Sequence, residues 1–126
     1  PLTHRDHAQT CLFVTGHLKD GTADLDWQAL VRAHQTVVIY MGLNALPDIC
    51  KQLIAHGAPD SRPIALVQNG TLGSQKILTG TLSDLPARAA QSQFTSPSLI
   101  IVGDVVKLQP SLSWFEPDQA AQHEAA

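Results

Sequence analysis

Hydrophobic residues fall into short clusters separated by Gly, Pro, Asn and Asp, and most clusters predict one element of structure. Five of them are nearly continuous and strand-sized, which favours β-strands at residues 11–15, 36–41, 63–67, 76–82 and 98–102. The cluster at 36–41, Thr-Val-Val-Ile-Tyr-Met, is apolar throughout, as in a strand whose two faces are both buried. Gly103 is expected to bend the last strand, and residues 105–108 to continue it as an edge.

The remaining apolar positions recur at helical spacing. Asp26 can cap a short helix over residues 27–33. Pro47 suits the first turn of a second helix, whose apolar stripe continues to Ile54 and which ends at His56-Gly57. A third short helix is predicted over residues 85–91.

The order of these elements predicts an α/β fold. Strand 36–41, its helix and strand 63–67 form a βαβ unit, so the two strands should run parallel, whereas strand 76–82 should run antiparallel to its predecessor. We therefore expect a mixed, mostly parallel sheet of about five strands with helices on both faces. Residues 1–115 are expected to form this domain, and residues 116–126, polar and Ala-rich, a flexible tail.

Composition narrows the range of partners. Hydrophobic residues make up 44% of the 126-residue chain and charged residues 15%, as in a globular domain. The net charge is −3 and the eight Lys and Arg are scattered without an evident basic patch, so neither nucleic acid nor an anionic membrane is expected as a partner. No apolar run, including 37–41 and 99–102, approaches the roughly 20 residues of a membrane span. Cys11 and Cys50 fit buried thiols in a reducing compartment, and we expect a cytoplasmic protein.

Candidate chemistry lies where strands end, because ligands of open α/β sheets settle beyond the carboxyl ends of strands. Met41 and Gly70 follow two strands expected to be parallel and should share one rim. Met41 is either a core residue or a soft contact for an aromatic ligand. Gly70 is either a turn residue that needs a positive φ or a place where a ligand approaches the backbone. Taken singly, each residue favours the structural interpretation.

The other candidate residues give weaker evidence for a functional site. His17 follows the first strand and is either a proton donor or a capped core histidine. His4 and His7 have helical spacing for a metal pair, but no third ligand is evident, so no metal site is predicted. The chain contains neither GxGxxG, GxxxxGK[ST], GxSxG nor HExxH, and its carboxylates form no evident acid–base pair.

Six segments in order resemble the C-terminal half of uroporphyrinogen-III C-methyltransferases, of the tetrapyrrole methylase family. They are PLTHRD at 1–6, VTGH at 14–17, YMGL at 40–43, ALVQNGT at 65–71, LIIVGDVV at 99–106 and LSWF at 112–115. The resemblance implies the C-terminal domain of the tetrapyrrole methylase fold, in a homodimeric enzyme that transfers two methyl groups from S-adenosylmethionine to uroporphyrinogen III. The product, precorrin-2, leads to sirohaem or cobalamin.

The same resemblance implies roles for individual residues. Met41 and Gly70 correspond to S-adenosylmethionine contacts, with Tyr40 and Asn69 as their neighbours. Residues Thr15, Gly16 and His17 lie in a segment near the substrate cleft. The family's Gly-rich loop and its proton-transfer groups belong to an N-terminal half that these residues do not contain, so no catalytic residue is expected here and the chain alone should be inactive.

Two alternatives remain open from sequence. One is the C-terminal half of a methylase acting on a later corrin precursor, although Tyr40-Met-Gly-Leu43 and Gln68-Asn-Gly-Thr71 favour the uroporphyrinogen enzyme. The other is a stand-alone binding or dimerisation module. Met41 is the only methionine in the chain, so we expect these residues to be a piece of a longer protein.

Overall fold

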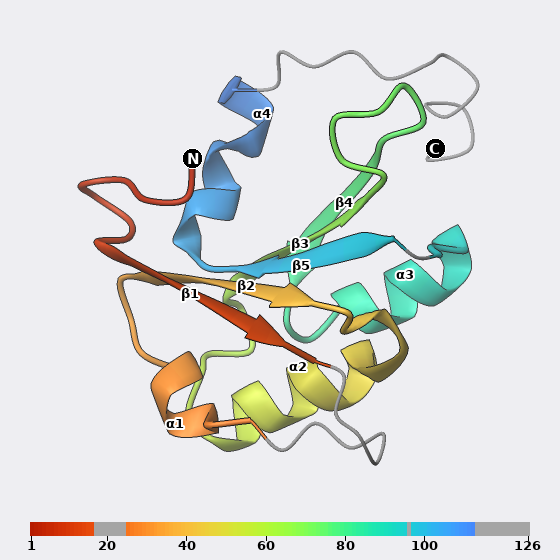
Figure 1. Cartoon of the computed structure of the whole chain (residues 1–126). Coiled ribbons are helices and arrows are strands. Elements are labelled where there is room, and N and C mark those ends of the chain that lie inside the picture. The colour runs from red at the N-terminus through yellow and green to blue at the C-terminus, as the bar shows by residue number, and fades with distance from the viewer. Residues whose placement is uncertain (17–24, 96, 113–126) are drawn as a thin grey trace.

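The computed structural model describes residues 1–16, 25–95 and 97–112. Within them the chain forms a five-stranded sheet of order β1-β2-β5-β3-β4. Figure 1 shows the elements, which are β1 (Thr10–Thr15), α1 (Trp27–Leu30), β2 (Gln35–Tyr40), η1 (Leu43–Ala45), α2 (Leu46–Ala55), β3 (Pro63–Gln68), β4 (Lys76–Thr81), α3 (Leu85–Ser92), β5 (Ser98–Val102), η2 (Asp104–Leu108) and α4 (Gln109–Leu112).

Most of the predicted helices and strands are confirmed. The spacing of apolar residues and the Gly, Pro and Asp residues between the clusters indicate nearly the same boundaries as the structure. Asp26 caps α1 by accepting from the backbone N–H of Ala29, although α1 ends at Leu30 rather than Ala33. Pro47 lies in the first turn of α2, and His56 ends this helix, followed by Gly57 at φ 112°. The proposed tail at 116–126, and with it the domain boundary, lies outside the described residues.

The sheet is mixed as predicted, but the expectation that it is mostly parallel is wrong. β1 and β2 pair in parallel, whereas β5 pairs antiparallel with both β2 and β3, and β3 pairs antiparallel with β4. β2 and β3 do point the same way, as the βαβ unit requires. They are not hydrogen-bonded to each other because β5 lies between them.

The predicted continuation of β5 as an edge strand is also wrong. Gly103 adopts φ 143°, a conformation that side chains rarely tolerate, and a Cβ here would lie 2.8 Å from the Gln35 carbonyl oxygen. The chain therefore leaves the sheet and forms η2, which buries Val105 and Val106. Val-Val predicts a strand by propensity, but burial of both side chains against the sheet favours the helical turn.

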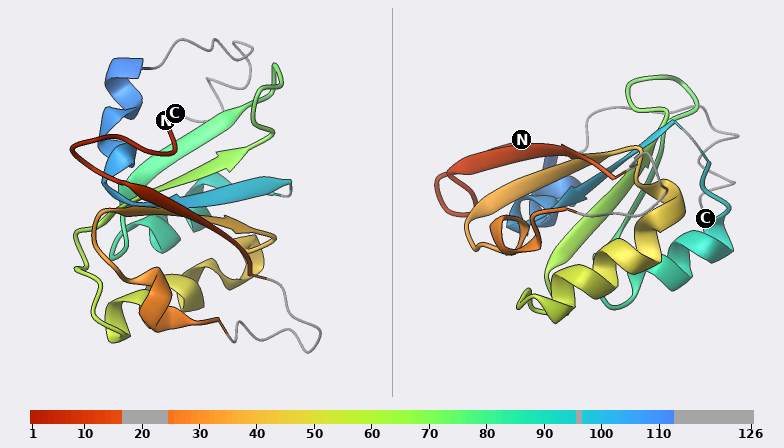
Figure 2. Two further views of the ribbon diagram at one scale, coloured as in Figure 1. Left: turned by 60° about the vertical axis from the view of Figure 1, so that its left-hand side comes forward. Right: turned by 60° about the horizontal axis from the view of Figure 1, so that its bottom comes forward.

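The hydrophobic core lies between the sheet and α1, α2 and α3, which all cover one face (Figures 1 and 2). Alternate residues of β2, Val37 and Ile39, face this core with Ile49 and Leu53 of α2, and all four are nearly inaccessible to solvent. η2 and α4 lie on the other side of the sheet (Figure 2). No helix within the described ranges is long and apolar enough to span a bilayer.

Candidate functional site

The carboxyl ends of β2 and β3 lie at one edge of the sheet, which we call the apolar rim and define by Tyr40-Met41 and Asn69-Gly70. Both strands are antiparallel to β5, so their ends meet at the same edge. Met41 follows the last residue of β2, and Gly70 comes two residues after the last residue of β3. The prediction that Met41 and Gly70 share one rim is confirmed.

A cavity of about 490 Å³ opens at the apolar rim. Its lining includes all four residues of the definition, Tyr40, Met41, Asn69 and Gly70, together with Leu43 and Leu72. Among the described residues that line it there is no Asp, Glu, Lys, Arg or His. Such a cavity suits a flat apolar group with a few polar edges, and Tyr40 is the only titratable side chain among its described lining residues.

Met41 is not a core residue. Its side chain is 65% exposed, and its backbone adopts φ 56°, in the left-handed region. A non-glycine residue in this region carries strain of about 1 kcal/mol or more, so the surrounding contacts must hold it. The backbone N–H of Gly16 donates to the Tyr40 carbonyl at 2.6 Å, and the N–H of Ala45 donates to the Gly42 carbonyl at 3.0 Å, which fixes the turn on both sides.

Asn69 and Thr71 repeat this conformation after β3, with φ 53° and 69°. The N–H of Asn69 donates to the Pro97 carbonyl at 3.1 Å, and the Asn69 side-chain Nδ2 donates to Ser74 Oγ at 3.1 Å. The N–H of Thr71 donates to the side-chain oxygen of Gln75 at 2.7 Å. Both turns of the apolar rim are therefore strained and closely hydrogen-bonded, an arrangement that is common at ligand sites.

Gly70 does not have the positive φ that the structural interpretation assumed, since the left-handed residues are its two neighbours. A Cβ built on Gly70 meets only Val67 Cγ1, at 3.4 Å, which is an ordinary contact. Neither the turn nor the packing of the described chain therefore requires glycine here.

At position 16, in contrast, the packing of the chain requires glycine. A Cβ on Gly16 would lie 2.8 Å from Gly42 Cα, because the turns after β1 and β2 touch at these two glycines. Thr15 is exposed and stands opposite Tyr40 in the register of β1 and β2. Thr15 and Gly16 thus adjoin the apolar rim without lining its cavity. His17 lies outside the described residues.

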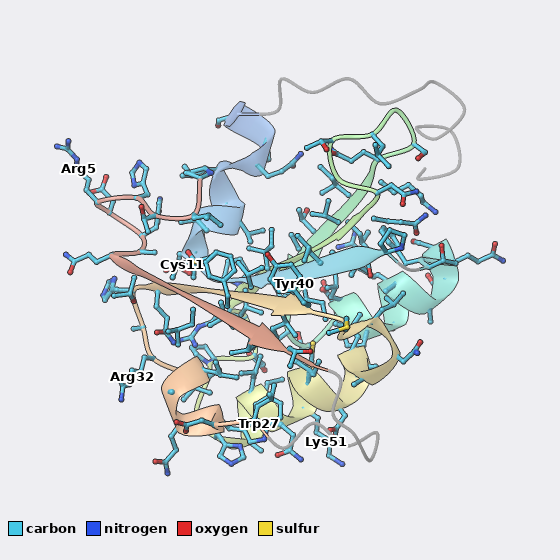
Figure 3. All side chains as sticks on the ribbon, in the orientation of Figure 1. Arg5, Cys11, Trp27, Arg32, Tyr40 and Lys51 are labelled. Carbon is cyan, nitrogen blue, oxygen red and sulfur yellow. The ribbon has the colours of Figure 1, made fainter. Side chains whose placement is uncertain are left out.

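An aromatic pair continues the apolar rim on the sheet face away from α2. Phe13 and Tyr40 stack with ring centroids 6.2 Å apart, and their side chains are 55% and 43% exposed. Figure 3 shows Tyr40 on the side of β2 away from α2. Exposed aromatic rings beside an apolar cavity are typical of surfaces that contact a ligand or another protein.

Both cysteines behave as thiols rather than as ligands or nucleophiles. Burial raises the pKa of Cys50, a residue of α2 that faces the core, to about 12. Burial also raises the pKa of Cys11, on β1. Neither residue is therefore activated for nucleophilic chemistry. In the described ranges no three His, Cys, Asp or Glu residues come together as a metal site would require.

Part of the cavity lining is not evident from the sequence. Pro97, Ser98 and Leu99 line it because β5 starts at this rim, between the ends of β2 and β3. The direction of an apolar strand cannot be seen in its composition, so nothing in residues 98–102 signalled this. Leu72 was a detectable signal, since it is a large apolar residue in an otherwise polar Gly-rich loop and is 56% exposed.

Comparison with known proteins identifies the family. Residues 1–86, which include both turns of the apolar rim, match the model of the Tetrapyrrole (Corrin/Porphyrin) Methylases. The chain belongs to the tetrapyrrole methylases.

The curated relatives are much longer than this chain. The chain is 60% identical to siroheme synthase of Methylobacillus flagellatus over 117 residues, which is 93% of this chain and 25% of that protein. It is 58% identical to siroheme synthase of Pseudomonas aeruginosa PAO1 over 116 residues, 92% of this chain and 25% of that protein. The chain thus spans about a quarter of these relatives.

Solved tetrapyrrole methylase structures share the fold. Uroporphyrin-III C-methyltransferase from Thermus thermophilus, solved with S-adenyl homocysteine, superposes with a TM-score of 0.74 at 27% identity, over 86% of this chain and 48% of that one. Cobalt precorrin-4 methyltransferase gives the same TM-score of 0.74 at 19% identity, over 84% of this chain and 45% of that one, which shows a shared fold.

Proposed function

We propose that this chain is the C-terminal half of an S-adenosylmethionine-dependent uroporphyrinogen-III C-methyltransferase, serving sirohaem or cobalamin biosynthesis. The observation that carries the proposal is the convergence of two strained turns, about 30 residues apart in sequence, on one apolar cavity of about 490 Å³. The proposal is also supported by about 60% identity to siroheme synthase and by the shared fold with a uroporphyrin-III C-methyltransferase solved with S-adenyl homocysteine.

The residues that line the cavity fit the adenosine part of S-adenosylmethionine. In this proposal the exposed thioether of Met41 packs on the adenine ring, and the bare backbone of Gly70 lets the nucleoside approach. Tyr40 and Asn69 supply the neighbouring ring and amide. When bound, the cofactor supplies an electrophilic methyl group. The residues of this rim bind and orient the cofactor and exclude water from one side.

The chain alone is proposed to be inactive. Methyl transfer requires the donor carbon and its nucleophile to be held in line and away from water. The cavity is open and has no Asp, Glu, Lys, Arg, Cys or His among its described lining residues, so in this proposal these functions belong to the rest of the protein. Thr15, Gly16 and His17 are proposed to lie on the side of the cleft that takes uroporphyrinogen III.

Assembly as a cytoplasmic homodimer belongs to the same proposal, with residues 1–115 as its C-terminal domain. Support comes from the exposed Phe13–Tyr40 pair, which is an apolar surface of the kind that subunits cover. Light scattering of the full-length protein at rising concentration tests the proposed homodimer. Self-association supports the homodimer, and a monomer at high concentration contradicts it.

A methylase of a later corrin precursor remains a second candidate, because cobalt precorrin-4 methyltransferase matches the fold with the same TM-score as the uroporphyrin enzyme. Product analysis decides between them. The protein at its full natural length is expected to convert uroporphyrinogen III to precorrin-2, whereas the 126-residue chain gives no product. Turnover by the chain alone would contradict the two-half proposal, and methylation restricted to a later precursor would favour the second candidate.

Calorimetry tests the cofactor residues directly. In the full-length protein, Met41→Ala is expected to weaken S-adenosylhomocysteine binding about tenfold while the melting temperature stays nearly constant, because Met41 is 65% exposed. Ile54→Ala is the matched control, since Ile54 is also an exposed large apolar residue, 36% exposed, but lies on α2. Equal affinity in both variants would remove Met41 from the proposed site.

A further inference from the structure

The opposite edge of the sheet carries a second cavity, of about 320 Å³. It lies where β2 and β3 begin and β5 ends, and its lining includes Arg32, Arg62 and Lys107. We call this edge the basic rim and define it by these three residues. A strand of six residues is about 20 Å long, so the basic rim is separate from the apolar rim.

Arg62 is the half-buried centre of the basic rim. Its Nη1 donates to the Val31 carbonyl at 2.7 Å, which anchors the guanidinium against the end of α1. Burial lowers the pKa of Arg62, and the charge of Asp104 partly opposes that effect. A guanidinium has five N–H donors. Partial burial without a directly paired anion costs free energy that an anion would recover.

Asp104 does not neutralise this rim. Within the described part of the chain its carboxylate pairs with Lys107, at 3.9 Å, and not with Arg62. The side chains of Lys107 and Asp104 are 61% and 43% exposed, and an exposed pair at this distance is weak and easily rearranged. Three basic residues against one carboxylate leave an excess of two positive charges around the cavity, on a chain whose net charge is −3.

The backbone fixes this arrangement. Gly103 lines the cavity at φ 143°, and any Cβ there would strike the Gln35 carbonyl oxygen. Its N–H donates to the Pro63 carbonyl at 2.9 Å, which ties the end of β5 to the residue that follows Arg62. The turn therefore places Asp104 and Lys107 beside Arg62. No basic patch is evident in the sequence because folding brings together residues that lie 30 and 45 positions apart.

We propose that the basic rim binds a small oxyanion with two or more negative charges, through phosphate or carboxylate groups held between Arg62, Arg32 and Lys107. Planar guanidinium groups match the paired oxygens of both groups. The cavity has room for a molecule of the size of pyrophosphate or citrate. Figure 3 shows Arg32 on the outer side of the α1–β2 connection, and its side chain is part of the cavity lining.

The test is calorimetry of the full-length protein with pyrophosphate and, separately, with citrate. The double variant Arg32→Gln with Lys107→Gln removes two positive charges from exposed positions, and Arg62 with its anchor to Val31 remains. The matched control, Arg5→Gln with Lys51→Gln, removes the same charge from the N-terminal turn and from α2 (Figure 3). Thermal melts of all three proteins verify that they are folded.

We expect at least one anion to bind, with affinity about tenfold weaker in the basic-rim variant and changed less than about twofold in the control. Tighter binding of pyrophosphate identifies a phosphate site, and tighter binding of citrate identifies a carboxylate site. A third variant, Arg62→Lys, keeps the charge but loses the planar donor geometry, and it should also weaken binding. Failure of the wild-type protein to bind either anion, or an equal loss in the control, would overturn the proposal.

Discussion

At the carboxyl end of β2 the chain exposes a methionine over an uncharged cavity, whereas at the amino end of the same strand a cavity is surrounded by three cations. The apolar rim holds strained non-glycine residues, Met41 and Asn69, in left-handed conformations. The basic rim also has a left-handed non-glycine residue, His34 at φ 58°, but its most crowded point is occupied by a glycine, Gly103. Strain tolerated on a large exposed side chain suggests selection for that side chain, and a glycine at a crowded point suggests selection for the turn.

The largest expected effect separates the glycines of the two rims. Gly103→Ala should destabilise the protein by about 3 kcal/mol or more, because φ 143° is nearly restricted to glycine and the new Cβ would lie 2.8 Å from the Gln35 carbonyl oxygen. Gly70→Ala should change the free energy of unfolding by less than about 0.5 kcal/mol, because its Cβ meets only Val67 at 3.4 Å.

Urea unfolding of both variants measures this difference. If Gly70→Ala is as costly as Gly103→Ala, Gly70 has a structural role and loses its argument as a cofactor contact. A Gly103→Ala protein of normal stability would show instead that the turn into η2 is adaptable, and the basic rim would lose its rigid support.

The second prediction uses alkaline pH to ask whether the two rims unfold together. Cys50 lies in the core shared by β2 and α2, and burial raises its pKa from about 9 in an unfolded chain to about 12. The unfolded state therefore loses this proton first as pH rises. The contribution to stability is complete below pH 9 and then falls by about 1.4 kcal/mol per pH unit until about pH 12, or about 3 kcal/mol by pH 11.

The Cys50→Ala variant is the control. Subtracting its free energy of unfolding from that of the wild-type protein at each pH cancels the titration of all other groups. Amide exchange at the two ends of β2, followed by mass spectrometry, reports each rim. Equal acceleration at both ends shows one cooperative unit. Earlier exchange at Tyr40 than at Gln35 would mean that the apolar rim opens by itself.

The third prediction concerns Met41, whose replacement should change stability only slightly. Met41→Gly removes the cost of a left-handed side chain and should leave stability unchanged or raise it by up to about 1 kcal/mol, as glycine adopts φ 56° readily. The same change should weaken S-adenosylhomocysteine binding in the full-length protein, because the thioether is lost. On the same samples, thermal melting measures the change in stability and calorimetry measures the change in affinity. Loss of stability with unchanged affinity would make Met41 a structural residue after all.

Much of the apolar rim could be predicted from sequence because local patterns encode it. The continuous apolar cluster of β2, and the helix that follows it, establish that β2 and β3 point the same way, and Met41 and Gly70 follow directly. Nothing local encodes the position of β5 between these strands, so Leu99 was missed at the site and a mostly parallel sheet was expected. The basic rim was missed for the same reason, since Arg32, Arg62 and Lys107 approach one another only after the strands have paired.

The central position of β5 also affects how the protein can form during synthesis. β2 and β3 are joined through a strand that comes after both of them in the chain, at residues 98–102. A nascent chain that ends before β5 holds two half-sheets, β1-β2 and β3-β4, each with an exposed apolar edge. The ribosome must therefore release almost the whole described domain before the sheet can close, and until then both edges are available to chaperones or to aggregation.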